Sequence, residues 1–261
     1  EQVQVDALRS ISGLEKCELI RPGYAIEYDY FPTHQLKSTL ESKNVRGLFM
    51  AGQMNGTSGY EEAAAQGIVA GINAALSVFC DSCFTVRRDE GYIGVLIDDL
   101  ITKDIAEPYR MFTSRAEHRL HLRQDNADIR LSNKAINLGL LNKEHSKAFV
   151  SFYNQYNSTK EILKNTTVKH NNKSTSSWDF LKRPNASIFN SSALKTTNKI
   201  SKRALFAVES DAKYEGYINI QLKKINKTRE LEKMAIPPAF DYTKIANLSS
   251  EAKEKLIKIK P

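Results

Sequence analysis

The residues best suited to bind a ligand form a glycine-rich run, Gly52-Gln53-Met54-Asn55-Gly56-Thr57-Ser58-Gly59. Glycines let the backbone approach a bound group closely, and an apolar stretch after the run predicts a helix that begins near Tyr60 or Glu61. The N-terminus of a helix presents unpaired N–H groups and a partial positive charge to an anion. We therefore expect a phosphate or cofactor site here. An ordinary turn between a strand and a helix is the alternative.

The elements around this run must position it. Two strands are expected before it, Tyr24–Phe31 and the more buried Val45–Ala51, because β-forming residues dominate both. Ser58 and Glu61 have the spacing of a capping box, which marks the start of the helix. The helix is apolar on most sides, so we expect it in a core, with small residues that permit close approach to a sheet at Ala64, Gly67, Gly71 and Ala75.

A second set of chemically useful residues contains four arginines: Arg110, Arg115, Arg119 and Arg123. Ser114 and Glu117 again have capping-box spacing, so the last three arginines, four residues apart, would share one helix face. The alternation RLHLR also allows a change to strand near Leu120. Guanidinium groups match phosphate oxygens and stack on bases. Internal pairing is the alternative, with the carboxylates of Asp98, Asp99, Glu107 or Glu117 as partners.

Cys80 and Cys83 form a C-x-x-C pair. One pair supplies half of a four-ligand zinc site, and no second pair follows, so we expect no metal site. His118 and His121 lie near the arginines without a carboxylate at an obvious spacing, and they could be structural or face RNA.

Composition places the chain among globular proteins, since 41% of its 261 residues are hydrophobic and 26% are charged. The longest apolar stretch is too short to span a membrane, and the first residues do not resemble a signal peptide. Three cysteines do not build a disulfide scaffold, which favours a reducing, intracellular compartment. The net charge of +8 is regional: the balance is −3 over 1–150, +4 over 151–189 and +7 over 190–261.

The chain changes in character near residue 150, where Asn, Ser, Thr and Lys begin to dominate. The stretch Asn165–Thr175 is typical of a solvated loop. Apolar residues at intervals of three or four, with lysines between them, predict an amphipathic helix over Asp211–Lys233, which Pro237 and Pro238 would end. A further short helix is expected over Ser249–Ile259. The basic excess in this part favours contact with RNA.

Three runs carry a resemblance to a known family: RPGYAIEYDYF (Arg21–Phe31), LESKNVRGLFMAGQMNGTSGYEEAAAQGIVAGINAA (Leu40–Ala75) and EPYRMFTSRAEHRLHLRQDNADIRL (Glu107–Leu131). They closely resemble the GidA/MnmG family, the tRNA uridine 5-carboxymethylaminomethyl modification enzymes. The likeness spans about residues 10–141 and continues more weakly in Lys213–Ile218 and Asp241–Leu256.

The resemblance implies an FAD-dependent enzyme that uses NADH and methylene-tetrahydrofolate to modify carbon 5 of the wobble uridine of certain tRNAs. It also implies a GTPase partner, a homodimer and a cytoplasmic or organellar location. The expected fold class is α/β plus all-α. Residues 1–79 would be the C-terminal part of a Rossmann-like FAD-binding domain, 80–150 a mixed α/β continuation with the arginines, and 151–261 a helical basic C-terminal domain. Both ends look truncated relative to the family.

The residues carried over from the family are few, and no catalytic residue is among them. The FAD contact at the end of the strand falls on Gln53, with Gly52, Asn55, Gly56, Thr57 and Gly59 shaping the loop. Contacts to tRNA or the active site fall on Arg110, Arg115 and Arg119. Two alternatives remain: a folate- and FAD-dependent tRNA uridine methyltransferase, and a non-enzymatic RNA-binding module with a degenerate flavin fold. The chain alone is expected to be inactive.

Overall fold

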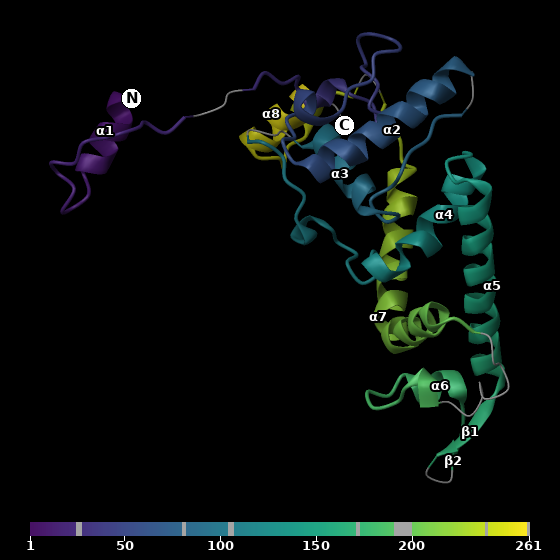
Figure 1. Ribbon diagram of the computed structural model, residues 1–261. Helices are drawn as coiled ribbons and strands as arrows, with labels where there is room; N and C mark the ends of the chain where they lie inside the picture. The colour runs from purple at the N-terminus through teal and green to yellow at the C-terminus, as the bar shows by residue number, and fades with distance from the viewer. Residues whose placement is uncertain are drawn as a thin grey trace.

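The computed structural model describes residues 1–24, 28–79, 82–103, 107–170, 173–190, 200–237 and 240–259. Helices dominate these ranges (Figure 1). The α-helices are α1 (Gln2–Arg9), α2 (Tyr60–Val78), α3 (Tyr92–Thr102), α4 (Ala127–Asn137), α5 (Lys143–Asn165), α6 (Ser177–Leu181), α7 (Lys202–Glu232) and α8 (Ser250–Ile259). Short 3-10 helices lie at Thr33–Gln35, Gly52–Asn55, Thr113–Arg115, Gln124–Asn126, Ile188–Asn190 and Tyr242–Lys244.

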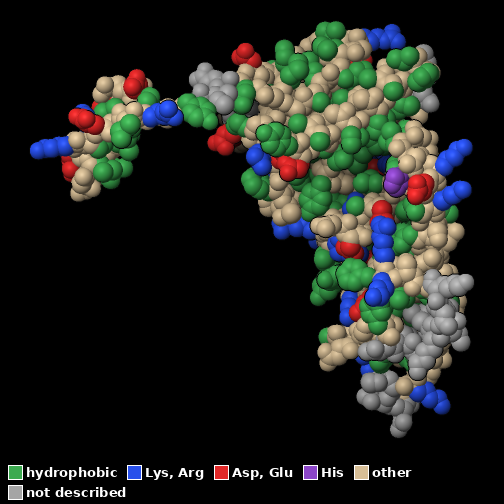
Figure 2. All heavy atoms as spheres, viewed as in Figure 1, with side chains coloured by type: hydrophobic (Ala, Val, Ile, Leu, Met, Phe, Trp, Pro, Cys, Tyr) green, Lys and Arg blue, Asp and Glu red, His purple; other side chains and the backbone are tan. Residues whose placement is uncertain are grey.

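Helices α2 and α3 pack against each other in the upper part of the molecule, whereas α1 lies apart from it (Figure 1). Their shared core contains Leu36, Leu40, Val69 and Ile97, all nearly inaccessible. The opposite face of α2 is open to the described part of the chain, because Ile68 is 59% exposed and a Cβ atom on Gly67 or Gly71 would meet no described atom within 4 Å. The expected burial of this helix therefore holds for one face only. Figure 2 shows hydrophobic side chains spread over the surface of this part.

The two predicted strands are not found among the described residues. Tyr24 and residues 28–31 form no strand, and residues 25–27 lie outside the described ranges. The segment Val45–Ala51 forms only an isolated bridge, between Glu41 and Phe49. A left-handed turn at Gly47, with φ +81°, interrupts the extended backbone that a strand requires.

The sheet that the structure does describe is a hairpin of β1 (Thr167–His170) and β2 (Lys173–Ser176). The strands are antiparallel, and Thr167 lies opposite Ser176. The prediction of a loop over Asn165–Thr175 is therefore wrong, and β-branched residues in both strands explain why. The described residues contain no parallel sheet, so the helical part of the expected fold class is the part that the structure bears out.

Helices α5, α6 and α7 build the lower part of the molecule (Figure 1). Their core includes Phe152, Leu163, Leu181 and Val208, which are all buried. A helix at the predicted position is confirmed as α7, but it begins at Lys202, where the Ser201 hydroxyl accepts the Ala204 N–H at 3.2 Å as a cap. Its predicted apolar face is only partly buried, since Ile225 is buried and Tyr214 is 39% exposed. The short helix predicted near the C-terminus is confirmed as α8.

Ion pairs join the helical part to the region before it. Arg123 Nη2 lies 2.9 Å from Asp211 Oδ1 on α7, and Asp211 also accepts hydrogen bonds from Lys160 and from the Tyr156 hydroxyl. Burial by itself would raise the pKa of Asp211, but these hydrogen bonds and charges outweigh it and lower the pKa. In the described ranges, no helix has both the length and the apolar character needed to cross a membrane.

Candidate cofactor and RNA site

The glycine-rich run folds as a tight loop that leads into α2. Gly52 and Gly56 have φ values of +75° and +67°, which side chains disfavour. A Cβ atom on Gly52 would lie 3.2 Å from that of Ala63, so the loop packs closely on the first turn of α2. The local conformation thus depends on glycine at these two positions.

A buried side chain on α2, Gln66, holds the loop from below. Its Oε1 accepts hydrogen bonds from the Gly52 N–H at 2.9 Å and from Asn55 Nδ2 at 2.8 Å. Its Nε2 donates to the Thr57 hydroxyl at 2.7 Å, and that hydroxyl donates to the Gly52 carbonyl at 2.6 Å. All three side chains are buried, so Asn55 and Thr57 shape the loop rather than line its surface.

Gln53 is the predicted site residue that the loop exposes. Its neighbour Met54 is 46% exposed, so this edge of the loop can contact a ligand. Asn55 Oδ1 is buried and has no hydrogen-bond partner among the described residues. The loop therefore combines an exposed amide with an unsatisfied buried oxygen.

The start of α2 differs from the predicted capping box. Gly59 is the N-cap and no side chain accepts a hydrogen bond there, so the Ser58–Glu61 prediction is wrong. Glu62, rather than Glu61, lies beside the N-cap residue. A Cβ atom on Gly59 would lie 1.8 Å from Glu62 Oε2, and Glu62 Oε1 accepts the Met111 N–H at 2.9 Å. That hydrogen bond is the main reason that the pKa of Glu62 is lowered. The buried Glu62 carboxylate therefore lies at the first turn of α2, where a hydrogen bond with its own backbone N–H also helps to lower its pKa.

The glycine-rich loop and the arginine segment are far apart in the sequence but lie side by side in the structure. The Tyr109 N–H donates to the Gly56 carbonyl at 2.8 Å, and the Met111 N–H donates to Glu62. Arg110, between them, is 57% exposed at its side chain, and its Nε lies 3.5 Å from Glu62 Oε1. A cavity of about 380 Å³ opens beside these residues; its lining consists of Glu61, Glu62, Ala65, Tyr92, Ile93, Leu96, Arg110 and Met111.

The arginine segment is neither the expected helix nor a strand. A single 3-10 turn spans Thr113–Arg115, and irregular turns follow. The Arg115 carbonyl accepts a hydrogen bond of 3.1 Å from Arg88 Nη2, and no helix continues from this turn. Consequently Arg119 and Arg123 do not share a helix face with Arg115.

The three arginines have different environments. Arg115 Nη1 lies 3.6 Å from Asp99 Oδ2, and its guanidinium lies 4.6 Å from the centre of the Tyr109 ring. Arg119 is exposed and forms no ion pair with a carboxylate in the part of the chain that the structure describes. Arg123 turns inward to Asp125 and Asp211. The internal-pairing alternative therefore fits Arg115, through Asp99, whereas Arg123 pairs with carboxylates other than those expected. Arg110 and Arg119 are exposed.

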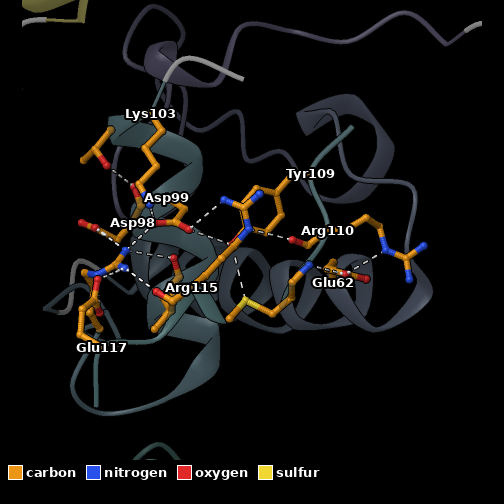
Figure 3. A network of polar contacts seen from close by, with 12 residues as sticks. Glu62, Asp98, Asp99, Lys103, Tyr109, Arg110, Arg115 and Glu117 are labelled. Carbon is orange, nitrogen blue, oxygen red and sulfur yellow. Dashed lines mark hydrogen bonds and ion pairs between the residues drawn. The ribbon is translucent and has the colours of Figure 1, made fainter. Parts of the chain in front are cut away.

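Asp99 is the centre of a polar network (Figure 3). Its pair with Arg115 is among those expected from the sequence, whereas Arg88 and Lys103 were not expected in it. Asp99 is fully buried, and it pairs with Arg88 and Lys103 at 2.6 Å each and accepts a hydrogen bond of 3.1 Å from the Tyr109 hydroxyl. Burial by itself would raise the pKa of Asp99, but hydrogen bonds from Lys103 and Arg88 outweigh it and lower the pKa. Burial, together with the charge of Asp99, also raises the pKa of Tyr109. The signal in the sequence for a buried carboxylate is the pair of aspartates inside the apolar run YIGVLIDDLI.

Cysteine and histidine residues form no metal centre in the described ranges, where no group of three or more His, Cys, Asp or Glu side chains could hold a metal ion. Cys83 is an exposed free thiol, and Cys80 lies outside the described residues. His118 is half-buried, and its Nδ1 has no partner among the described residues. His121 lies beside α7, where its backbone N–H donates to Gln221 Oε1 at 3.0 Å.

Family models match most of the chain. A model described as glucose inhibited division protein A matches residues 1–80. Two models described as the C-terminal helical domain and the C-terminal helical bundle of the tRNA modifying enzyme MnmG/GidA match residues 143–222 and 224–261.

Individual relatives give the same result. The tRNA uridine 5-carboxymethylaminomethyl modification enzymes MnmG of Lactobacillus johnsonii and Christiangramia forsetii are each 46% identical to the whole chain. The solved structure of Aquifex aeolicus GidA is 47% identical over the whole chain, with a TM-score of 0.75. The chain spans 44% of the Lactobacillus protein, 45% of the Christiangramia protein and 44% of the Aquifex chain, which is less than half of each.

Proposed function

The chain belongs to the GidA/MnmG family, and on this premise we propose that it is part of an FAD-dependent tRNA-modifying enzyme. The reaction is the addition of a carboxymethylaminomethyl group to carbon 5 of the wobble uridine of certain tRNAs. The observation that carries the proposal is the hydrogen bond from the Tyr109 N–H to the Gly56 carbonyl, because it joins a candidate cofactor loop to a candidate RNA-binding segment. Such a joint site can bring a redox cofactor and an RNA base together.

The loop has the features that a flavin nucleotide needs. Gln53 is exposed at the loop edge, where its amide can donate and accept hydrogen bonds to ribityl hydroxyls or to the edge of a flavin ring. The N-cap of α2 is a glycine without a side chain, so N–H groups that Glu62 does not bond can donate to a polar part of the cofactor. Gly52, Gly56 and Gly59 keep the backbone free of side chains. FAD, when bound, would supply the redox chemistry, with NADH and methylene-tetrahydrofolate as co-substrates.

The arginine segment supplies the RNA contacts in this proposal. Arg110 and Arg119 are exposed, so their guanidinium groups can form bidentate hydrogen bonds with phosphate or stack on a base. Arg115 has a supporting position, because Asp99 and the Tyr109 ring hold its guanidinium. Glu62 orients Arg110 and at the same time fixes the start of α2.

The wider assembly is also part of the proposal. Residues 1–79 would contribute to the Rossmann-like FAD-binding domain, 80–150 would present the arginines, and 151–261 would form the basic helical domain that contacts tRNA. The complete enzyme would act as a cytoplasmic homodimer with a GTPase partner. Because the chain spans 44% of its Lactobacillus relative, it would supply only part of the cofactor pocket, and it would not be active alone.

The test uses the full-length protein with tRNA from a strain that lacks the gene. We expect a flavin absorbance spectrum from the purified protein. With the GTPase partner, NADH, methylene-tetrahydrofolate and an amine donor, mass analysis of the nucleosides should show a carboxymethylaminomethyl group on the wobble uridine. A methylated uridine as the product would favour the methyltransferase alternative. A colourless protein that binds tRNA without modifying it would favour the RNA-binding module.

The inactivity of the chain alone has its own test. The 261-residue chain, purified by itself, should retain no stoichiometric FAD and should leave tRNA unmodified. Stoichiometric FAD binding together with tRNA modification by the isolated chain would contradict this part of the proposal.

A further inference from the structure

A second cavity, of about 490 Å³, lies between α7 and the segment that leads into α3. Its walls come from residues 87–89, residues 117–118 and the C-terminal part of α7 over 224–232. None of these residues lines the cavity beside Arg110. The second cavity is therefore a separate place where a ligand could bind.

Positive charge exceeds negative charge around this cavity. Five Lys and Arg side chains contribute to the lining, against three carboxylates. Lys224 and Lys227 are three residues apart on α7, so they lie on one face of the helix. Both are exposed, and neither forms an ion pair with a carboxylate in the ranges that the structure describes. These two ammonium groups are thus not neutralised by a neighbouring side chain.

Two polar atoms of the lining residues are buried without a partner. Arg229 pairs through Nη2 with Asp89, which also accepts a hydrogen bond of 3.0 Å from Arg87 Nε. This pairing fixes the Arg229 guanidinium but leaves its Nε without an acceptor among the described residues. His118 Nδ1, from another wall of the cavity, is also unpartnered there. A buried donor without an acceptor is unfavourable, so an oxygen of an anion would complement Arg229 Nε, and it would complement His118 Nδ1 when that nitrogen carries a proton.

We propose that this cavity binds a backbone phosphate of RNA, with Lys224, Lys227 and Arg229 as the phosphate ligands. A phosphate offers several oxygens to a guanidinium and two ammonium groups at once. The same side of α7 continues to Tyr217, which is seven residues before Lys224 and 63% exposed. An exposed aromatic ring beside a phosphate site is typical of RNA recognition, because an unpaired base can stack on it. The identity of this RNA as tRNA rests on the proposed function.

The test compares variants of the full-length protein in binding to substrate tRNA at several salt concentrations. We expect the double substitution Lys224→Gln/Lys227→Gln to raise Kd at least fivefold. It should also reduce the slope of log K against log salt by about one to two, as loss of phosphate contacts requires. The matched control is Lys202→Gln/Lys223→Gln, which removes the same charge from exposed positions of α7 outside the cavity. The control should change Kd less than twofold. Arg229→Lys keeps the charge but removes Nε, and it should weaken binding severalfold.

Each other outcome contradicts a defined part of the proposal. An unchanged Kd for the double variant, or an equal effect of the control, would overturn the phosphate site. Inorganic phosphate that binds the wild-type protein but not the double variant, together with an equal tRNA Kd for both proteins, would assign the cavity to a free anion. If the wild-type protein modifies tRNA normally while the double variant binds it equally well, the proposed function stands and only this inference fails. If the wild-type protein neither binds nor modifies tRNA, the proposed function fails as well.

Discussion

The backbone N–H of Tyr109 donates a hydrogen bond of 2.8 Å to the carbonyl of Gly56. The same residue reaches Asp99 through its hydroxyl at 3.1 Å, so one side chain and its backbone connect the glycine-rich loop to the buried centre of α3. Because Asp99 also pairs with Arg88 and lies near Arg115, the loop and the arginines depend on one carboxylate. This dependence makes the site sensitive to changes at residues that no ligand would touch.

Asp99→Asn is expected to reduce the free energy of unfolding by about 3 kcal/mol at neutral pH, because it leaves the half-buried Arg88 without its most buried partner. The effect should depend on pH. The pKa of Asp99 is lowered in the folded protein from an unfolded value of about 3.9, so the stabilisation is fully present above that value and is lost as pH falls below it. Urea unfolding of both proteins from pH 3 to pH 7 measures the difference.

The outcome that would contradict this prediction is a difference in stability that stays constant from pH 7 to pH 3. Asp98→Asn is the matched control, since Asp98 also pairs with Arg88 but has a side chain that is 41% exposed. A partly exposed ion pair is worth about 0–1 kcal/mol, so the control should have a small effect.

Glu62→Gln tests whether this carboxylate orients Arg110. The glutamine can still accept the Met111 N–H, but it loses the charge that attracts Arg110 Nε. We expect kcat/KM for tRNA to fall about 3- to 10-fold, with a change in the free energy of unfolding below about 1 kcal/mol. Steady-state kinetics and urea unfolding of the full-length protein measure the two quantities.

Glu61→Gln provides the control for this substitution. Glu61 carries the same charge in the same turn of α2, is exposed and forms no hydrogen bond or ion pair with Arg110 or Met111 in the described structure. Equal losses of kcat/KM in both variants would show that the general charge of the helix start matters rather than the position of Arg110.

Gly59→Ala is expected to disturb the start of α2. The new Cβ atom would lie 1.8 Å from Glu62 Oε2, so the carboxylate has to move away and its hydrogen bond with Met111 is lost. We expect a loss of about 1–2 kcal/mol in the free energy of unfolding and weaker retention of flavin. Urea unfolding and the flavin-to-protein absorbance ratio measure these effects.

The control is a glycine in the middle of a helix with open space around it. A Cβ atom on Gly216 of α7 meets nothing within 4 Å, so Gly216→Ala should stabilise the protein by about 0.5–1 kcal/mol. The explanation for Gly59 would be wrong if Gly59→Ala unfolded at the same urea concentration as the wild-type protein and kept its flavin.

Sequence patterns predicted the elements that depend mainly on neighbouring residues. The glycine-rich loop, the start of α2 at Tyr60 and the existence of α7 and α8 follow from spacing and helix periodicity. The capping box at Ser58 failed because the N-cap of α2 is Gly59, one residue later, and the carboxylate three residues after it, on Glu62, accepts the Met111 N–H from a distant part of the chain. A pattern of four residues contains no information about such a distant partner.

Long-range pairing explains the other differences. The segment before the loop has β-forming residues, but a strand requires a neighbour, and Gly47 turns the chain away within the described residues. In the arginine segment, the Arg115 carbonyl accepts a hydrogen bond from Arg88, which lies 27 residues earlier, and the chain continues in turns rather than in a helix. Arg88 and Asp99 are eleven residues apart, and packing of α3 rather than any sequence motif brings them together.

Arg119 and Arg115 should separate binding from stability. Arg119 is exposed without a described ion pair, so Arg119→Gln should leave the free energy of unfolding within about 0.5 kcal/mol of wild type and should weaken tRNA binding about tenfold by loss of a phosphate or base contact. Arg115→Gln loses its contacts with Asp99 and the Tyr109 ring, so it should also destabilise the protein by about 1–2 kcal/mol. Filter binding of tRNA and urea unfolding of the full-length protein measure both quantities.

Lys147→Gln on the exposed side of α5 controls for simple loss of charge. Equal destabilisation by the two arginine substitutions, or tRNA binding by Arg119→Gln as tight as that of Lys147→Gln, would contradict the separate roles assigned to them.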